Sequence, residues 1–276
     1  MKRLRTSLLL LSIALAFVLR AAEPVDVLVQ GAEKLEIAEL LAALGPDATQ
    51  HTIGPFTFWS GQIGPHRVAV SLTGQALINC TAATVLGIET FQPRLIVSQG
   101  TSGAQAPYLT LHDIVVGERA LDYGRFESPA RAAGAGSDPS RWQPTPQPLR
   151  DPATGELRVY PDGFATDSAA HAVALRTRNP MGRVFSGIIG SAHEINLELD
   201  RVRWSRDTFG MDVEEMESGH VAALAHAFDI RYIAFRVVSD APYEGVPFYA
   251  MAARATGLFT VNFLHNLPAL PPRSAQ

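Results

Sequence analysis

Residues 232–240 read Tyr-Ile-Ala-Phe-Arg-Val-Val-Ser-Asp, a mostly apolar run that ends in Ser239 and Asp240. Such a run is typical of a strand buried on both faces of a sheet. Because ligands of open α/β sheets bind beyond the carboxyl ends of the strands, we expect Asp240 at the rim of a pocket. A carboxyl group in a partly dry pocket can have a raised pKa and donate a proton to a leaving group. The alternative is an Asp that caps the Ala-Pro turn that follows.

Arg236 lies inside the same apolar run, where a charged side chain requires a carboxylate partner. Glu36 and Glu217 are the candidates. Glu217 precedes a helix with a small-residue face, so its carboxylate is expected to point into the pocket and bind vicinal hydroxyl groups. Glu214 or Glu215, in the same acidic run, is expected to be solvated.

Two more polar clusters follow predicted strands. Glu36 lies in the first turn of a predicted helix, where the helix dipole alone would favour an acid, but its apolar neighbours direct it toward the sheet. Residues 98–103 read Ser-Gln-Gly-Thr-Ser-Gly, and small residues of this kind let backbone N–H groups approach a ligand closely.

The composition limits the class of protein. The chain has 276 residues, is 47% apolar and has a mean hydropathy near zero, which allows a sizeable core. The formal net charge is −4 and no basic block follows the first few residues, so no nucleic-acid partner is expected. Cys80 is the only cysteine, which excludes an internal disulfide. The histidines lack metal-site spacing, and the sequence has no phosphate-binding glycine motif and no Gly-x-Ser-x-Gly elbow; we expect neither a metal nor another cofactor.

The amino terminus has the pattern of an export signal. Lys2, Arg3 and Arg5 precede an apolar stretch over residues 8–19 that is short for a membrane span. We expect cleavage near Ala22, and retention as an uncleaved anchor is the alternative. Residues 1–22 would then direct the protein to the periplasm or outside the cell, with no stable membrane partner after cleavage.

Alternating strands and helices predict one three-layer α/β/α domain with a central mixed sheet over residues 23–276. The predicted strands cover residues 25–30, 57–60, 67–72, 94–98, 113–116, 183–190, 211–213 and 232–238, and the predicted helices cover residues up to 44, 76–89, 197–208, 217–228 and 249–267. Residues 125–167, rich in Pro, Gly, Ala, Ser and Arg, are predicted to be an insertion. It could be a lid, a subunit contact or a mobile surface excursion.

These segments, in this order, resemble the purine nucleoside phosphorylase superfamily, in particular its methylthioadenosine/S-adenosylhomocysteine nucleosidases. The resemblance covers nearly the whole chain after the export signal, except the insertion. The family motifs are Gly-Ala-Met-Glu-Glu-Glu (here 31–36), Thr-Gly-Ser-Ala-Gly-Gly with Ala-Pro and Gly-Asp-Ile-Val-Val (99–103, 106–107 and 113–116), Glu-Met-Glu-Ala (215–218) and Arg-Ala-Ile-Ser-Asp (236–240).

The resemblance implies a nucleoside phosphorylase-like fold and a role for each residue. Asp240, steadied by Ser239, would protonate purine N7, while Glu36 would activate the attacking water. Met216 and Glu217 would hold the ribose, Glu217 through its hydroxyl groups. Arg236 would help to order the water and the carboxylates. Substrate would also be bound by Thr101, Ser102 and Gly103. The family also implies a homodimer and a purine nucleoside as the small-molecule partner.

Some positions depart from the family pattern. Thr101 replaces a Ser, and Gln75 replaces an apolar residue that lines the alkylthio end of the site. Glu194, followed by Ile195, stands where the family has an aromatic residue that stacks on the base. Both are expected to contact substrate, and a replacement ring could come from Tyr243, Phe248 or Tyr249.

The nucleophile decides between hydrolysis and phosphorolysis. Phosphorolysis needs a cationic cradle for phosphate. Related phosphorylases carry an arginine where this chain has Ser98, and Glu36 would repel an anion. The sequence therefore predicts a nucleosidase that releases free base and a ribose derivative. The alternatives are a phosphate-dependent phosphorylase and a non-catalytic periplasmic nucleoside-binding or storage-like protein.

Overall fold

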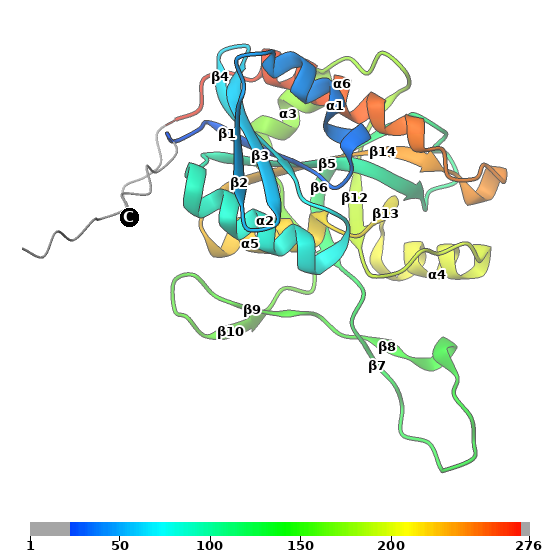
Figure 1. Ribbon diagram of the computed structural model, residues 1–276. Coiled ribbons are helices and arrows are strands. Elements are labelled where there is room, and N and C mark those ends of the chain that lie inside the picture. Colours follow the sequence, from blue (N-terminus) through cyan, green and yellow to red (C-terminus); the bar gives the residue numbers. More distant parts are fainter. Residues whose placement is uncertain (1–22, 272–276) are drawn as a thin grey trace, which may run out of the picture.

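The structure is a computed structural model that describes residues 23–271. The predicted export signal, residues 1–22, lies outside the described residues. The fold is a large central sheet covered on both faces by helices, from which part of the chain extends (Figure 1). Within residues 23–271, none of the helices has the length and apolarity needed to cross a membrane.

The central sheet has ten strands and is mixed. Its order is β11-β6-β12-β13-β5-β1-β4-β3-β2, and β14 pairs with both β5 and β6. Strand β5 runs parallel to β1 and β14 and antiparallel to β13. The strands are β1 (Val27–Gly31), β2 (Thr49–Ile53), β3 (Phe56–Ile63), β4 (His66–Leu72), β5 (Leu95–Ala104), β6 (Ile114–Asp122), β11 (Phe164–Ala165), β12 (Val184–Ser191), β13 (Val213–Glu215) and β14 (Arg231–Asp240).

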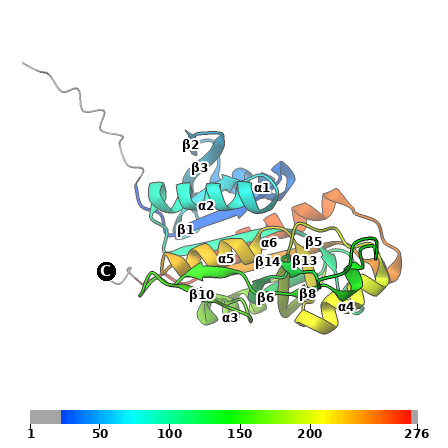
Figure 2. The same cartoon turned by 90° about the horizontal axis from the view of Figure 1, so that it is seen from below.

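Helices cover both faces of the sheet. In Figure 1, α1, α3 and α6 lie above the sheet and α2 and α5 lie below it, and Figure 2 gives the view from below. The predicted three-layer fold class is therefore confirmed. The helices are α1 (Lys34–Leu44), α2 (Ala76–Phe91), α3 (Ser168–Arg176), α4 (Leu199–Phe209), α5 (Ser218–Ala227) and α6 (Ala253–Asn266).

Each face of the sheet packs on its own apolar core. One core joins the strands to Ile37, Phe259 and Phe263 of the upper helices. The other joins them to Ile88 of α2 and to small residues of α5. Because both faces are covered, β1, β5 and β14 read as apolar runs rather than as alternating patterns.

The elements differ from the sequence prediction at a few places. Strand β2 and helix α3 were not predicted, and β13 begins two residues later than expected. The last helix begins at Ala253, after a single 3₁₀ turn over Ala250–Ala252, rather than at residue 249.

The predicted insertion consists mainly of two small hairpins. Figure 1 shows them as a green extension that leaves the body of the molecule beneath α5 and α4. Strand β11 then returns the chain to the edge of the main sheet beside β6. The hairpins pair β7 (Phe126–Glu127) with β8 (Gln143–Pro144) and β9 (Pro148–Arg150) with β10 (Leu157–Val159), with a 3₁₀ turn at Pro139–Arg141.

Candidate active site

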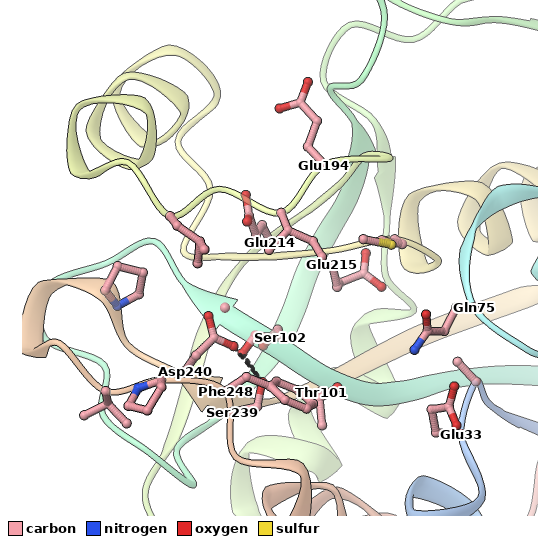
Figure 3. Close-up of a pocket in the computed structure, with 18 of the residues that line it drawn as sticks. Glu33, Gln75, Thr101, Ser102, Glu194, Glu214, Glu215, Ser239, Asp240 and Phe248 are labelled. Carbon is pink, nitrogen blue, oxygen red and sulfur yellow. Dashed lines mark hydrogen bonds between the residues drawn. The ribbon is translucent and has the colours of Figure 1, made fainter.

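A cavity of about 630 Å³ lies at the carboxyl ends of β1, β5 and β14 (Figure 3). Ligands of open α/β sheets bind at this edge, and the volume suits a small molecule. The parallel register aligns the strand ends, with Gly100 of β5 opposite Arg236 and Gly103 opposite Asp240. All the predicted site residues except Arg236, which lies behind the wall, line the cavity: Glu36, Thr101, Ser102, Gly103, Glu194, Ile195, Met216, Glu217, Ser239 and Asp240.

Glu36 is a buried carboxylate that joins α1 to β5. Its Oε2 accepts hydrogen bonds from the backbone N–H groups of Ala32 and Glu33 at 2.7 and 3.0 Å. Its Oε1 accepts one from the backbone N–H of Thr101 at 2.8 Å. A Cβ on Gly100 would lie 2.7 Å from that oxygen, so the close approach requires glycine. The carboxylate is thus a fixed acceptor on the cavity wall, suited to receive a proton from a bound water.

Arg236 is the cation at the centre of a buried polar cluster, with a side chain only 2% exposed. Its Nη2 lies 2.5 Å from Glu215 Oε2, and its Nη1 lies 3.4 Å from Glu217 Oε2. Nε donates to Ser218 Oγ at 2.9 Å and Nη2 to Ser98 Oγ at 3.0 Å. The guanidinium therefore fixes the start of α5, and both ion-pair partners come from the same short segment.

The position of Glu215 corrects the sequence analysis, which expected Glu214 or Glu215 to be solvated and named Glu36 and Glu217 as partners of Arg236. Glu215 is buried and forms the shorter ion pair, whereas Glu36 forms none with Arg236 within 4.0 Å. Glu215 also accepts hydrogen bonds from Ser191 Oγ and from the backbone N–H groups of Glu217 and Ser218. Burial is tolerated because these donors and Arg236 together replace the lost water.

Glu217 faces the cavity with its charge only partly compensated. Its Oε1 accepts a hydrogen bond from the backbone N–H of Ala76 at 2.7 Å, where Ala76 has a φ of 68°. Burial raises the pKa of Glu217 to about 7, against the opposing effect of the Arg236 charge. The negative charge of Glu215 raises this pKa further. An acceptor of this kind is suited to bind hydroxyl groups.

Asp240 stands at the opposite end of the cavity. Ser239 Oγ donates a hydrogen bond to Asp240 Oδ1 at 2.8 Å and lies 3.1 Å from the carbonyl oxygen of Ser102. Burial raises the pKa of Asp240, which favours the protonated form that a general acid needs. Among the hydrogen bonds of residues 23–271, Asp240 accepts none from the following turn, so it is not a cap. A Cβ on Gly103 would lie 2.9 Å from Asp240 Oδ2.

Glu214 is a second buried carboxylate near Asp240, so neither of the two acids between which the sequence analysis left the choice is solvated. The Tyr123 hydroxyl donates to it at 2.8 Å, and Asn196 donates through its backbone N–H at 2.8 Å and its side chain at 2.6 Å. Glu214 Cγ would lie 3.6 Å from a Cβ on Gly103, so this side chain and Asp240 converge over the same glycine. Burial raises the pKa of Glu214, and the Asp240 charge adds to this.

The rim of the cavity carries the positions where the sequence departs from the nucleosidase motifs. Glu194 forms an ion pair with Arg201 at 3.0 Å, and Figure 3 shows its carboxylate directed away from Asp240. Ile195 and Phe248 line the cavity with 74% and 64% of their surface exposed. Of the three aromatic residues considered as replacements for the missing ring, Phe248 is the one that lines the cavity.

Two further kinds of reactive group concern the site: the single cysteine thiol and side chains that could bind a metal ion. Cys80 is buried in the lower core, and burial raises the pKa of its thiol well above the usual range. Within residues 23–271, no group of three or more His, Cys, Asp or Glu side chains is arranged to hold a metal ion.

Comparison with known proteins gives the class of protein that this fold and site define. Residues 26–257 match the phosphorylase superfamily, and the chain therefore belongs to that superfamily. It is 29% identical over 244 residues to a 5′-methylthioadenosine/S-adenosylhomocysteine nucleosidase of Mycobacterium bovis, covering 85% of this chain and 94% of the relative. It is 25% identical to the enzyme of the same name from Actinobacillus succinogenes, covering 74% and 80%.

Solved structures agree on the fold. An S-adenosylhomocysteine nucleosidase from Streptococcus pyogenes, in complex with 5-methylthiotubericidin, superposes with a TM-score of 0.69 at 22% identity and covers 89% of this chain and 98% of that chain. A futalosine hydrolase from Helicobacter pylori superposes with a TM-score of 0.68 at 18% identity and covers 88% and 98%.

Proposed function

We propose that this protein is a nucleosidase that hydrolyses the N-glycosidic bond of a purine nucleoside, with water as the nucleophile. The observation that carries the proposal is the charge of the cavity wall. Among the described residues, no lysine or arginine lines the cavity, whereas its carboxylate lining comprises Glu33, Glu36, Glu194, Glu214, Glu215, Glu217 and Asp240.

This charge distribution suits a cationic transition state. Breaking the bond between base and sugar leaves an oxocarbenium-like ribosyl group, which fixed carboxylates stabilise in a cavity with little water. The same carboxylates repel a phosphate dianion. Ser98, at the position of the phosphorylase arginine, is occupied by a hydrogen bond from Arg236 at 3.0 Å. The distribution therefore favours water over phosphate.

The roles follow from where each group lies. Asp240 donates its proton to N7 of the purine, so that the base leaves as a neutral molecule with the bonding electron pair. Water attacks the anomeric carbon and gives its proton to Glu36. Glu217 accepts hydrogen bonds from the ribose hydroxyls, and Met216 packs beside it. Arg236 acts from behind the wall by fixing the carboxylates.

The relatives supply the substrate class. They are named 5′-methylthioadenosine/S-adenosylhomocysteine nucleosidases, and the same fold is found in a futalosine hydrolase. The substrate proposed here is a purine nucleoside with a 5′ substituent of the methylthioadenosine or adenosylhomocysteine type. The family match supports this class, and the cavity volume accommodates it.

The test is base release from a panel of purine nucleosides in phosphate-free buffer, read by chromatography. Release without phosphate is expected. Release that requires phosphate would make the protein a phosphorylase, and tight binding without turnover would make it a nucleoside receptor.

Asp240→Asn should lower turnover roughly 10²–10⁴-fold with folding intact, because it removes the proton donor. Asp200→Asn is the matched control, since the Asp200 side chain is 99% exposed and does not line the cavity. Equal rates in both variants would remove Asp240 from the mechanism.

We further propose that the protein is exported and dimeric. The basic and apolar pattern of residues 2–19 supports export. Large exposed apolar side chains support a subunit contact, namely Ile78 and the cavity-lining Ile195 and Leu197, at 74–77% exposure. Fractionation of cells and the molar mass in solution test the two proposals separately. A cytoplasmic or a monomeric protein would refute the corresponding one.

A further inference from the structure

The start of helix α2 is held by side chains that are distant in the sequence. A helix begins with backbone N–H groups that lack a partner inside the helix, and a local side chain usually accepts from them. Gln75 precedes α2, and its side chain makes no capping hydrogen bond among the residues that the structure describes. Instead, Glu217 Oε1 accepts from the N–H of Ala76 at 2.7 Å. His193 Nε2 accepts from the next N–H, that of Leu77, at 3.2 Å.

The backbone at this point needs outside support. Ala76 has a φ of 68°, in the left-handed region that residues other than glycine rarely adopt. Such a conformation is retained only where the surrounding contacts hold it. Because Ala76 donates the hydrogen bond to Glu217, a relaxation of this turn would take the donor away from the carboxylate. The hydrogen bond between His193 and the next residue opposes that relaxation.

The His193 ring packs against a second histidine. Its centroid lies 6.3 Å from that of His220 in α5, and the two rings are inclined by 58°. The His220 side chain is 7% exposed, and its Nδ1 lies 3.7 Å from Asp122 Oδ2. Burial lowers the pKa of His220, so this ring is neutral at neutral pH and places no positive charge beside His193. Because Leu77 donates to His193 Nε2, the neutral His193 ring carries its proton on Nδ1.

His193 belongs to the segment that forms the rim of the cavity. It is followed directly by Glu194 and Ile195, which line the cavity, whereas His193 is exposed and is not among the described lining residues. Its effect on a substrate therefore passes through other groups.

We propose that His193 is a positioning residue for Glu217. By accepting from Leu77, it fixes the turn at Ala76, whose N–H in turn holds Oε1 of Glu217. His193 thereby orients the carboxylate that binds the ribose hydroxyls. The inference rests on the proposed function, in which Glu217 has this role, and it adds to the site a residue from outside the cavity lining.

The expected effect is that of one ordinary hydrogen bond, roughly three- to tenfold in kcat/KM. It should be confined to substrates that carry the hydroxyl groups to which Glu217 binds. A substrate without these groups gains nothing from an oriented carboxylate, so its cleavage should not depend on His193. This selectivity distinguishes positioning of Glu217 from a general structural role.

The experiment measures kcat/KM of the full chain for 5′-methylthioadenosine and for its 2′,3′-dideoxy counterpart. His193→Ala should lower the value for the first compound roughly three- to tenfold and leave the value for the second unchanged. His193→Gln should restore the first value, since the glutamine side-chain oxygen can accept the same N–H. His265→Ala is the matched control, because it removes another exposed histidine that is not among the described lining residues, and it should change neither value.

Equal losses for both compounds would overturn the inference and leave the proposed function intact, because His193 would then act on the base or on the fold. An unchanged rate in His193→Ala, or no recovery in His193→Gln, would also overturn it. Where a compound is not cleaved, its calorimetric Kd replaces kcat/KM. If the unsubstituted protein cleaves neither compound, the proposed function fails and the Kd values decide the inference. Weaker binding confined to the compound with hydroxyl groups then supports it, and any other pattern, absent binding included, overturns it.

Discussion

Replacing Arg236 with methionine tests whether the guanidinium holds the buried carboxylates in place. The variant loses contacts to Glu215 at 2.5 Å, to Glu217 at 3.4 Å and to two serine hydroxyls. The Glu215 side chain, 3% exposed, would be left as a buried charge without its cation. Breaking a buried pair from one side costs about 3–5 kcal/mol, so the unfolding temperature should fall by about 6–20 °C for a chain of this size.

Two further variants isolate the cause of this loss. Adding Glu215→Gln to Arg236→Met removes the orphaned charge and should recover part of the stability. Arg254→Met removes an arginine that is 52% exposed and pairs with Glu39 at 2.6 Å, so it should cost no more than about 1 kcal/mol. Chemical and thermal unfolding at pH 7.5 measure all three. The reasoning is refuted if Arg236→Met unfolds like Arg254→Met, or if the double variant recovers nothing.

The same variant has a second consequence for catalysis. The Arg236 charge lowers the pKa of Glu217, which burial has raised to about 7. Without it, the pKa should rise further, and Glu217 would be protonated at neutral pH. The acidic limb of the kcat/KM profile should therefore move to higher pH. An unchanged limb in a folded variant would show that Glu217 does not need its charge.

Three other perturbations have outcomes that the geometry fixes. The pKa of Glu217 is about 7 in the folded protein and 4.5 in the unfolded chain, so the folded state binds more protons between these two pH values. The free energy of unfolding should therefore fall by about 3 kcal/mol as the pH rises from 4.5 to 7. Urea unfolding of Glu217→Gln should lack this fall, and a pH dependence identical to that of the unsubstituted protein would contradict the reasoning. Gly100→Ala places a Cβ 2.7 Å from Glu36 Oε1, so overpacking should cost about 1–3 kcal/mol and most of the activity, and a fully active variant would contradict this. Glu214→Gln removes a negative charge beside Asp240, so the pKa of Asp240 should fall. The basic limb of the pH profile of kcat/KM should then move to lower pH. A basic limb that stays in place would show that the two carboxylates do not interact.

The main elements and their convergence could be predicted from sequence. Buried parallel strands read as apolar runs, and their carboxyl ends meet at one edge of the sheet whatever the detailed packing. For that reason Glu36, Thr101 and Asp240, which are far apart in the chain, could be assigned to one site, and in the structure all three line the same cavity. The phosphorylase superfamily assignment, made from the motifs at these strand ends, is confirmed.

Burial within the acidic run could not be predicted, because it depends on distant partners. Three acids at a helix start are typical of a solvated helix terminus. Here Glu215 is buried by Arg236, which lies on another strand, and Glu214 by Tyr123 and Asn196. None of these pairings leaves a local pattern in the sequence. The arginine inside an apolar run was the available signal, and it indicated that a carboxylate was needed without identifying which one.

Helix α3 was missed although its start has a recognisable signal. Asp167 precedes Ser-Ala-Ala-His-Ala-Val-Ala-Leu, and its side chain caps the helix by accepting from the backbone N–H of Ala170 at 2.8 Å. The irregular composition of residues 125–167 extended the predicted insertion up to this cap. Strand β2 has an exposed and partly buried pattern with no apolar alternation, so only its pairing with β3 defines it.

Arg236 compensates the charges of Glu215 and Glu217 unequally, and this difference explains how Glu217 can respond to charge that develops on the substrate. Glu215 lies 2.5 Å from the guanidinium and takes most of its compensation, which leaves Glu217 at 3.4 Å with a raised pKa. A buried carboxylate whose charge is only partly compensated destabilises the free protein. It becomes favourable when positive charge develops on the ribose, so the interaction is stronger in the transition state than in the ground state. A second cation in the wall would stabilise the fold, but it would also cancel the difference between the interaction in the transition state and that in the ground state. This gives a physical reason for a wall that carries carboxylates with Arg236 behind it.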